Sequence, residues 1–245
     1  MSTTAFDSVP SLDRTNASRS KAKVARMEER VLPRLCNEAV GALGEAELNS
    51  MTTAAARVIE QLFDVLRIDH HNDQNTRDTP RRVAKMFVEE LLRGRYTAPP
   101  PITEFDNATA NKQLIVTGPI DVRSMCAHHL MPIYGEAYIG VVPSASGKLI
   151  GLSKYDRIVE YFAARLQLQE ELVSQIGQHI VEATNPLGLG VRISAVHMCK
   201  THRGVTSSRC GRMVNSWFFG ELLEDSSLRL EFLEECRLLG SGGSV

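Results

Sequence analysis

The sequence contains no long hydrophobic run, and this argues against a membrane-spanning helix. No apolar stretch in its 245 residues approaches the roughly 18 to 20 residues that a helix needs to cross a bilayer. The first twenty residues also lack the apolar centre of a secretory signal. They contain Asp7 and Asp13 beside Arg14 and Arg19, which disfavours an organelle transit peptide. We therefore expect a cytoplasmic protein without a membrane partner.

A strong charge of one sign is also missing. The chain has 28 Lys and Arg against 29 Asp and Glu, a formal net charge of -1, so no global field draws it to nucleic acid. Any anion-binding site has to be local. The five cysteines are odd in number and widely spaced, and a chain of this length does not need disulfide staples. A cysteine here is therefore interpreted as a buried apolar side chain or a metal ligand.

The hydrophobic pattern predicts an α+β domain with antiparallel strands after a helical N-terminal portion. Residues 1–20 are predicted to form a disordered tail, within an N-terminal extension over 1–48, and a helix is expected between Lys21 and Leu43. The remainder, 49–245, is predicted to be one folded domain. Apolar residues three to four apart predict helices over Met51–Leu66, Thr79–Gly94, Ser153–Leu166, Glu170–Ala183 and Ser227–Leu238. Strands are expected over Leu114–Thr117, Ile120–Met125, Ile133–Val142 and Gly190–Lys200.

Cysteine and histidine side chains form a candidate metal site. Cys126 and His129 are three residues apart, and Cys199 ends a predicted strand on the same face as His197. Two thiolates and one imidazole suit zinc, and three protein ligands leave the fourth position for water, as in catalytic sites. His128 and His197 then become candidate proton carriers. The alternative is that Cys199 and His197 are ordinary core residues.

Two predicted helix starts carry clustered cations. Arg82 and Lys85 follow Thr79 and Pro80, where positive side chains oppose the helix dipole unless an anion binds there. The second start contains a possible capping box from Ser153 to Asp156, and its cations, with one from a later loop, are Lys154, Arg157 and Arg203. Such a set suits a polyphosphate. Surface ion pairs are the competing interpretation.

Five segments, in this order and spacing, resemble the type I GTP cyclohydrolase family. They are Asp78–Met86 (DTPRRVAKM), Cys126–His129 (CAHH), Gly151–Arg157 (GLSKYDR), Gln167–Glu170 (QLQE) and His197–Cys199 (HMC). The resemblance covers Asn49 to Leu239. It implies a zinc-dependent GTP cyclohydrolase I of the tunnelling fold, in which an antiparallel sheet has helices on one side. The implied reaction hydrolyses GTP at C8 to 7,8-dihydroneopterin triphosphate and formate, the first step of pterin and folate biosynthesis.

The same resemblance implies a role for each matching position. The zinc ligands would be Cys126, His129 and Cys199, and the proton-handling histidines would be His128 and His197. Gln169 and Glu170 would read guanine, whose N1–H and exocyclic amine are adjacent donors that a carboxylate can accept. The implied triphosphate contacts are Arg82, Lys85, Ser153, Lys154, Arg157 and Arg203. The family assembles into homo-oligomers, and we expect a decamer of stacked pentamers with active sites between subunits.

Two departures from the family pattern keep other hypotheses open. Ala127 stands where the family usually has glutamate, and the strand after Arg203, usually rich in threonine, reads SRCGRMVNSW over Ser208–Trp217. Besides an active GTP cyclohydrolase, we consider a divergent enzyme acting on another purine or pterin nucleotide. We also consider a catalytically silent paralogue that serves as a structural or regulatory partner.

Overall fold

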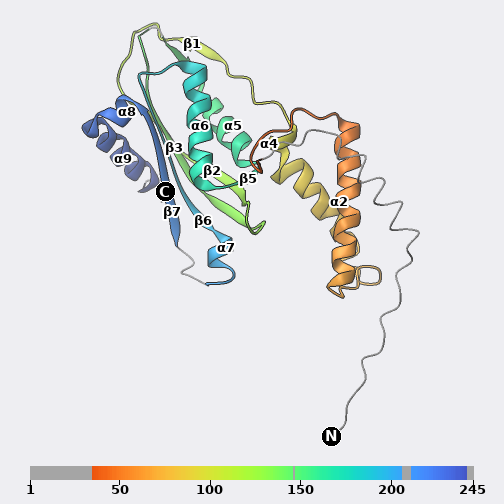
Figure 1. Ribbon diagram of the computed structural model, residues 1–245. Helices are drawn as coiled ribbons and strands as arrows, with labels where there is room; N and C mark the ends of the chain where they lie inside the picture. Colours follow the sequence, from red (N-terminus) through yellow and green to blue (C-terminus); the bar gives the residue numbers. More distant parts are fainter. Residues whose placement is uncertain (1–34, 146, 206–210, 242–245) are drawn as a thin grey trace. The chain divides into compact units, whose positions relative to one another are not determined.

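The computed structural model describes residues 35–145, 147–205 and 211–241 (Figure 1). The expected tail over 1–20 and most of the helix expected between Lys21 and Leu43 lie outside these residues, and residues 35–44 form no helix. Helix α2 spans Glu45–Val65 and begins after Gly44, with two acidic residues in its first turn. The expected boundary between residues 48 and 49 therefore falls inside a helix. No helix among the described residues is long and apolar enough to cross a membrane.

The single helix expected from Thr79 to Gly94 is divided into three parts. These are α3 (Thr79–Lys85), a π-helical turn η1 (Met86–Leu91) and α4 (Arg93–Tyr96). Docking of α4 on a later helix explains the break, because the Gly94 backbone N donates to Ala164 O at 3.0 Å. A Cβ on Gly94 would lie 2.0 Å from the carbonyl oxygen of Tyr161, so only glycine permits this approach.

A five-stranded sheet forms the core of the described residues, in the order β5-β2-β3-β6-β7. Its long strands are antiparallel, and the short β5 pairs in parallel with the end of β2. Their bounds are β2 Ile115–Cys126, β3 Pro132–Val142, β5 Leu166–Gln167, β6 Gly188–His197 and β7 Arg212–Gly220. The two strands expected before Met125 are one strand, with a register shift between Thr117 and Ile120.

The sequence did not predict the short strands, because hydrophobic alternation cannot be detected over only two or three residues. Besides β5, these are β1 (Glu104–Asp106) and β4 (Lys148–Ile150), which form a separate two-stranded sheet.

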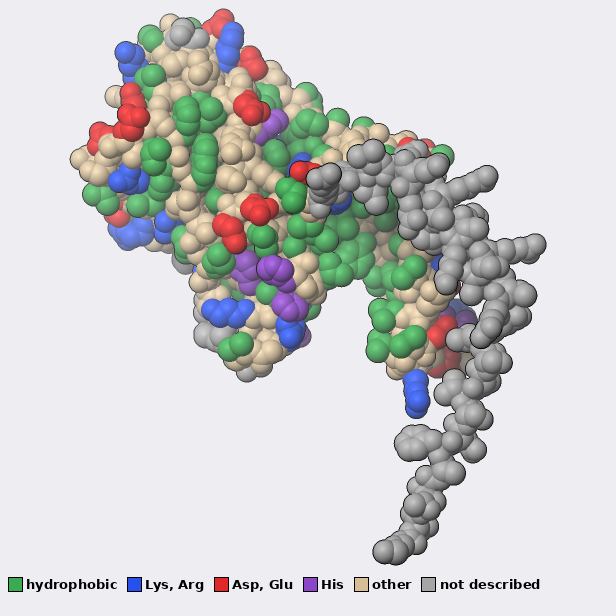
Figure 2. All heavy atoms as spheres, viewed as in Figure 1, with side chains coloured by type: hydrophobic (Ala, Val, Ile, Leu, Met, Phe, Trp, Pro, Cys, Tyr) green, Lys and Arg blue, Asp and Glu red, His purple; other side chains and the backbone are tan. Residues whose placement is uncertain are grey.

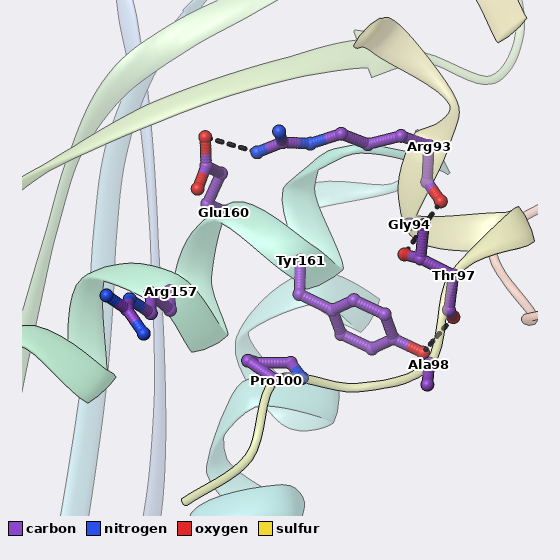
Figure 3. A pocket seen from close by; sticks show the side chains of 8 residues that line it. All are labelled: Arg93, Gly94, Thr97, Ala98, Pro100, Arg157, Glu160 and Tyr161. Carbon is purple, nitrogen blue, oxygen red and sulfur yellow. Dashed lines mark hydrogen bonds and ion pairs between the residues drawn. The ribbon is translucent and has the colours of Figure 1, made fainter. Parts of the chain in front are cut away.

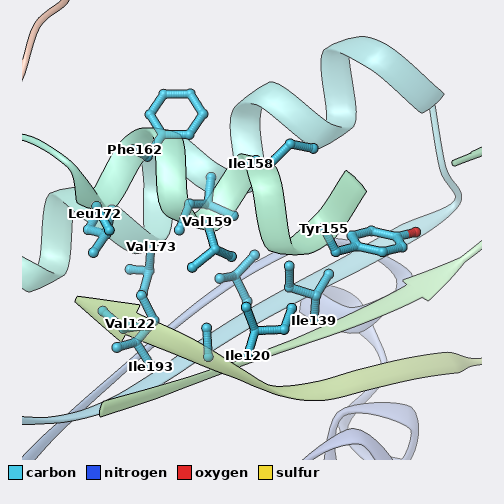
Figure 4. Packing of buried hydrophobic residues seen from close by; sticks show 14 of the residues in the cluster. Ile120, Val122, Ile139, Tyr155, Ile158, Val159, Phe162, Leu172, Val173 and Ile193 are labelled. Atoms are coloured by element: carbon cyan, nitrogen blue, oxygen red, sulfur yellow. The ribbon is translucent and has the colours of Figure 1, made fainter. Parts of the chain in front are cut away.

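Helices cover both faces of the five-stranded sheet, which corrects the expectation of helices on one side (Figure 1). On one face, α5 (Leu152–Ala163) and α6 (Gln169–Thr184) bury alternate residues of β2, β3 and β6 (Figure 4). On the other face, α9 (Ser226–Ser241) packs against β2, β3 and β6, and α8 (Glu221–Glu224) packs against β6 and β7. The physical reason lies in β3, where Tyr138 and Val142 are apolar on the second face and pack with Phe232.

The bulky Trp217 of β7 has a structural explanation. Its ring lies over Gly177 of α6, where an added Cβ would come 2.2 Å from the indole. We expect Gly177→Ala to lower the free energy of unfolding by about 1–3 kcal/mol, because the core has no room for a methyl group. Urea denaturation measures this. In a Trp217→Phe background the penalty should shrink, and an equal penalty in both backgrounds would contradict the packing.

Candidate functional site

The strands bring the predicted metal ligands to one edge of the sheet. Both β2 and β6 run antiparallel to β3, so their last residues, Cys126 and His197, lie at the same edge. The register pairs Ile133 at the start of β3 with His197. The turn after Cys126 is closed by its backbone, since Leu130 N donates to Cys126 O at 3.0 Å. Figure 2 shows histidine side chains gathered together, with lysine or arginine beside them.

Cys126, His129 and Cys199 converge at this edge. One donor atom from each residue lies within 4.8 Å of the other two. Cys126 is buried, Cys199 half-buried and His129 exposed, so the group opens to solvent on the histidine side. Cys199 is not on the strand as expected: β6 ends at His197, and Cys199 lies in the short helix α7 (Met198–Thr201). The reason is that the backbone coils there, with His202 N donating to Met198 O at 2.9 Å.

The charges around the two thiols favour a cation between them. Burial raises the pKa of the Cys199 thiol, and the neighbouring Cys126 raises that pKa further, whereas Arg203 acts in the opposite direction. Two thiolates so close repel each other unless a positive charge separates them. Thiolate and imidazole are the ligands that zinc prefers. The residues present therefore fit a zinc ion.

The two predicted proton carriers have different environments. His128 is exposed, with its ring centroid 6.3 Å from that of His129. His197 is partly buried, and its Nε2 lies 2.7 Å from Oε1 of Gln169. Burial lowers the pKa of His197, and the nearby Glu170 carboxylate partly opposes that shift.

Gln169 has all its polar atoms occupied by the protein. The side chain is 1% exposed, and its Nε2 donates to the carbonyls of Ile193 and Met213 at 3.1 and 3.0 Å. Its Oε1 is therefore an acceptor, and His197 Nε2 must carry the hydrogen in this contact. Gln169, which was predicted to contact guanine, thus accepts a hydrogen bond from His197, a predicted proton carrier. The sequence motif did not indicate this contact.

We expect Gln169→Leu to lower kcat by about 10- to 100-fold, because general acid–base catalysis contributes roughly 10²–10⁴-fold and the loss of this hydrogen bond leaves His197 wrongly oriented for part of the time. KM should change little, because the affected group is the histidine and not a free contact to the base. Steady-state kinetics, with zinc content measured in parallel, test this. Gln178→Leu, at an exposed position on the same helix, is the control. A normal kcat in Gln169→Leu would contradict the positioning role.

Glu170 lies exposed in the first turn of α6. Residues 164–168 connect α5 to α6. Buried polar side chains hold this connection in place, and the sequence did not indicate their roles. Gln167 is 0% exposed and donates to Phe162 O at 2.7 Å. Arg165 donates to Gly94 O and Asn37 O at 3.1 and 2.8 Å. Polar residues in an otherwise apolar stretch were the available signal. Ala127 N also donates to Gln167 O at 3.2 Å, which ties the metal-ligand turn to the same connection.

The cations of α5 lie at its first turns, although the helix cap differs from the expected one. Gly151 is the cap and no side chain caps the helix, so Ser153 is free for another partner. Lys154 is half-buried and Arg157 exposed. Arg157 lines a cavity of about 300 Å³ together with the ion-paired Arg93 and Glu160 (Figure 3). The metal-ligand group does not line this cavity.

The predicted phosphate contacts Arg82 and Lys85 of α3 are exposed and ion-paired within the chain. Arg82 lies 3.4 Å from Asp78 and Lys85 lies 3.6 Å from Glu89. Helix α3 packs chiefly against α2 and η1, so one chain does not bring these cations to the cysteines. Arg203, by contrast, lies close enough to Cys199 to influence its pKa. Ser208, Arg209 and Cys210 of the divergent strand lie outside the described residues.

A family model and several curated proteins place the chain in one family. The family model described as GTP cyclohydrolase I matches residues 55–237. The chain is 37% identical to GTP cyclohydrolase 1 of Flavobacterium johnsoniae, covering 74% of this chain and 79% of that protein. It is 36% identical to the protein of the same name from Hahella chejuensis, with 76% and 95% covered. The Bacillus subtilis protein is 36% identical, with 74% and 93% covered.

Proposed function

The chain belongs to the GTP cyclohydrolase I family, and we propose that it opens the imidazole ring of GTP with a zinc ion held by Cys126, His129 and Cys199. The convergence of these three donor atoms within 4.8 Å carries the proposal. The products are 7,8-dihydroneopterin triphosphate and formate. A bound zinc ion supplies a Lewis acid that makes water nucleophilic near neutral pH.

The two histidines of the site move the protons. His197 donates through Nε2 to Gln169, which leaves its Nδ1 free to accept a proton as water adds at C8. Burial lowers the pKa of His197, which favours the neutral imidazole that a general base requires. His128 is exposed beside His129 and is suited to exchange protons with solvent. A second hydrolysis then releases C8 as formate, and the opened ribose rearranges and closes on the pyrimidine amines.

Glu170 reads the guanine base. Its exposed carboxylate accepts from N1–H and the exocyclic amine of guanine, two adjacent donors that adenine does not present. Gln169 supports this end of the site by orienting His197 and by tying the start of α6 to β6 and β7. The base is thus held beside the histidine that takes the proton.

The triphosphate is bound by cations that come from separate segments. Ser153, Lys154 and Arg157 offer donors at the start of α5, and Arg203 follows the metal ligands. Arg82 and Lys85 serve the site of a neighbouring subunit, because α3 packs chiefly against α2 and η1 in its own chain. This division is expected for a tunnelling-fold catalytic domain over 49–245 that assembles as a decamer of stacked pentamers.

Formate release from GTP and from ATP by the zinc-loaded protein tests the function. Formate with a dihydropterin absorbance from GTP, and none from ATP, is the expected result. Formate from another purine nucleotide in preference to GTP would support the divergent enzyme. Zinc binding without formate from any nucleotide would support the silent paralogue.

A further inference from the structure

A second group of metal-ligating side chains lies where α2 ends. Asp64 is in the last turn of this helix, and His70 and His71 are in the loop that follows. One donor atom from each lies within 4.8 Å of the others, and Asp64 Oδ1 is 3.1 Å from His70 Nε2. A tetrahedral zinc ion with bonds of about 2.0–2.2 Å holds its ligand atoms roughly 3.3 Å apart. Small side-chain movements would therefore place one ion among the three groups.

The loop holds both histidines in place. His70 is 5% exposed, and its ring packs edge-on against Phe63 with centroids 5.8 Å apart. Asp69 Oδ1 accepts from the backbone N of His71 and of Asn72 at 3.1 and 3.0 Å. The two imidazole rings lie 4.1 Å apart between centroids. Because these contacts fix the turn before any ligand arrives, an ion would find a largely preformed site.

The local charge also favours a cation. The C-terminus of a helix carries the negative end of its dipole, and the last turn of α2 contains no basic residue to balance it. The carboxylates of Asp64 and Asp69 add negative charge at the same place. His71 is exposed and its ring lies against that of His70, so its imidazole can reach an ion held by Asp64 and the buried His70.

We propose that Asp64, His70 and His71 bind a divalent transition-metal ion such as Zn²⁺, and that this ion fastens the end of α2 to the loop before α3. Two imidazoles and one carboxylate suit zinc, cobalt and nickel, whereas magnesium and calcium prefer oxygen ligands alone. The site shares no residue with the cysteine site. The inference therefore does not depend on the proposed function.

Zinc content per chain tests the proposal. The protein is equilibrated in a buffer that holds free zinc in the micromolar range, washed by gel filtration and analysed for metal. Wild type should hold one zinc equivalent more than His71→Ala. His71 is exposed, so its replacement should leave folding and GTP turnover unchanged. Gln74→Ala, at an exposed position of the same loop, should bind as wild type does.

Cobalt substitution distinguishes the two sites by spectrum. Cobalt on thiolates absorbs strongly in the near ultraviolet, whereas cobalt on imidazole and carboxylate shows only weak visible bands. His71→Ala should lose a weak visible contribution and keep the thiolate band. Equal metal content in wild type and His71→Ala would overturn the proposal. If the cobalt-loaded wild-type protein shows the weak visible bands but no thiolate band, the result would count against the proposed catalytic site and would still support the Asp64, His70 and His71 site.

Discussion

Replacing Cys199 with alanine is expected to abolish formate release from GTP. Cys199 provides one of three converging donor atoms, and two remaining ligands do not fix an ion in an open catalytic geometry. Loss of an outer hydrogen-bond partner of a zinc ligand already costs roughly 10- to 100-fold in affinity or activity. Loss of a ligand itself should exceed that. Zinc content by mass spectrometry and formate by a coupled assay measure both effects.

The control is Cys36→Ala, another free cysteine outside the metal-ligand group. It should retain zinc and activity, since its thiol is not part of the convergent set. If Cys199→Ala loses neither the zinc nor the formate, the cysteine pair is a core feature and the assigned metal site is wrong. Circular dichroism of each variant shows whether the fold survives the change.

Glu170→Gln should lower kcat/KM for GTP by roughly 10³-fold or more, because a site built to accept two donors is left offering an amide N–H to one of them. That loss corresponds to about 4 kcal/mol of transition-state binding. The substitution keeps the size and shape of the side chain, so the effect reports charge and hydrogen bonding. Steady-state kinetics with GTP measure it.

Glu171→Gln is the matched control, one position along the same helix. Glu171 accepts a hydrogen bond from Asn37, and glutamine keeps an acceptor there, so activity should stay close to that of wild type. Similar losses in both variants would mean that the start of α6 is merely sensitive to charge. A normal Glu170→Gln enzyme would remove Glu170 from the role of guanine reader.

The long elements could be predicted because their patterns are strong. The apolar spacing of α5 and α6 and the alternation in β3 and β6 follow directly from burial on one face. Cys199 was placed on a strand because alternation was continued past His197, where the chain coils into α7. The sequence predicts an unbroken helix from Thr79. The break arises from the contact between Gly94 and Ala164, and these two residues are too far apart in the sequence for a local pattern to indicate it.

The site was predictable where residue type and spacing carry the chemistry. Cys126 and His129 are close in sequence, and Cys199 is predicted from its place at the end of a strand face that also carries His197. The family resemblance then supports the same three residues. The use of Gln169 was not predictable, because its partners Ile193 and Met213 follow 24 and 44 residues later. The group at Asp64, His70 and His71 also depends on a loop conformation that hydrophobic periodicity does not encode.

Removal and restoration of zinc tests the central claim most directly. The protein is stripped with a chelator, confirmed to be zinc-free and still folded, and assayed for formate from GTP before and after one equivalent of zinc is returned. The account predicts no formate from the stripped protein and recovery on adding zinc, with no recovery in Cys199→Ala. Full formate release from the zinc-free protein would contradict it.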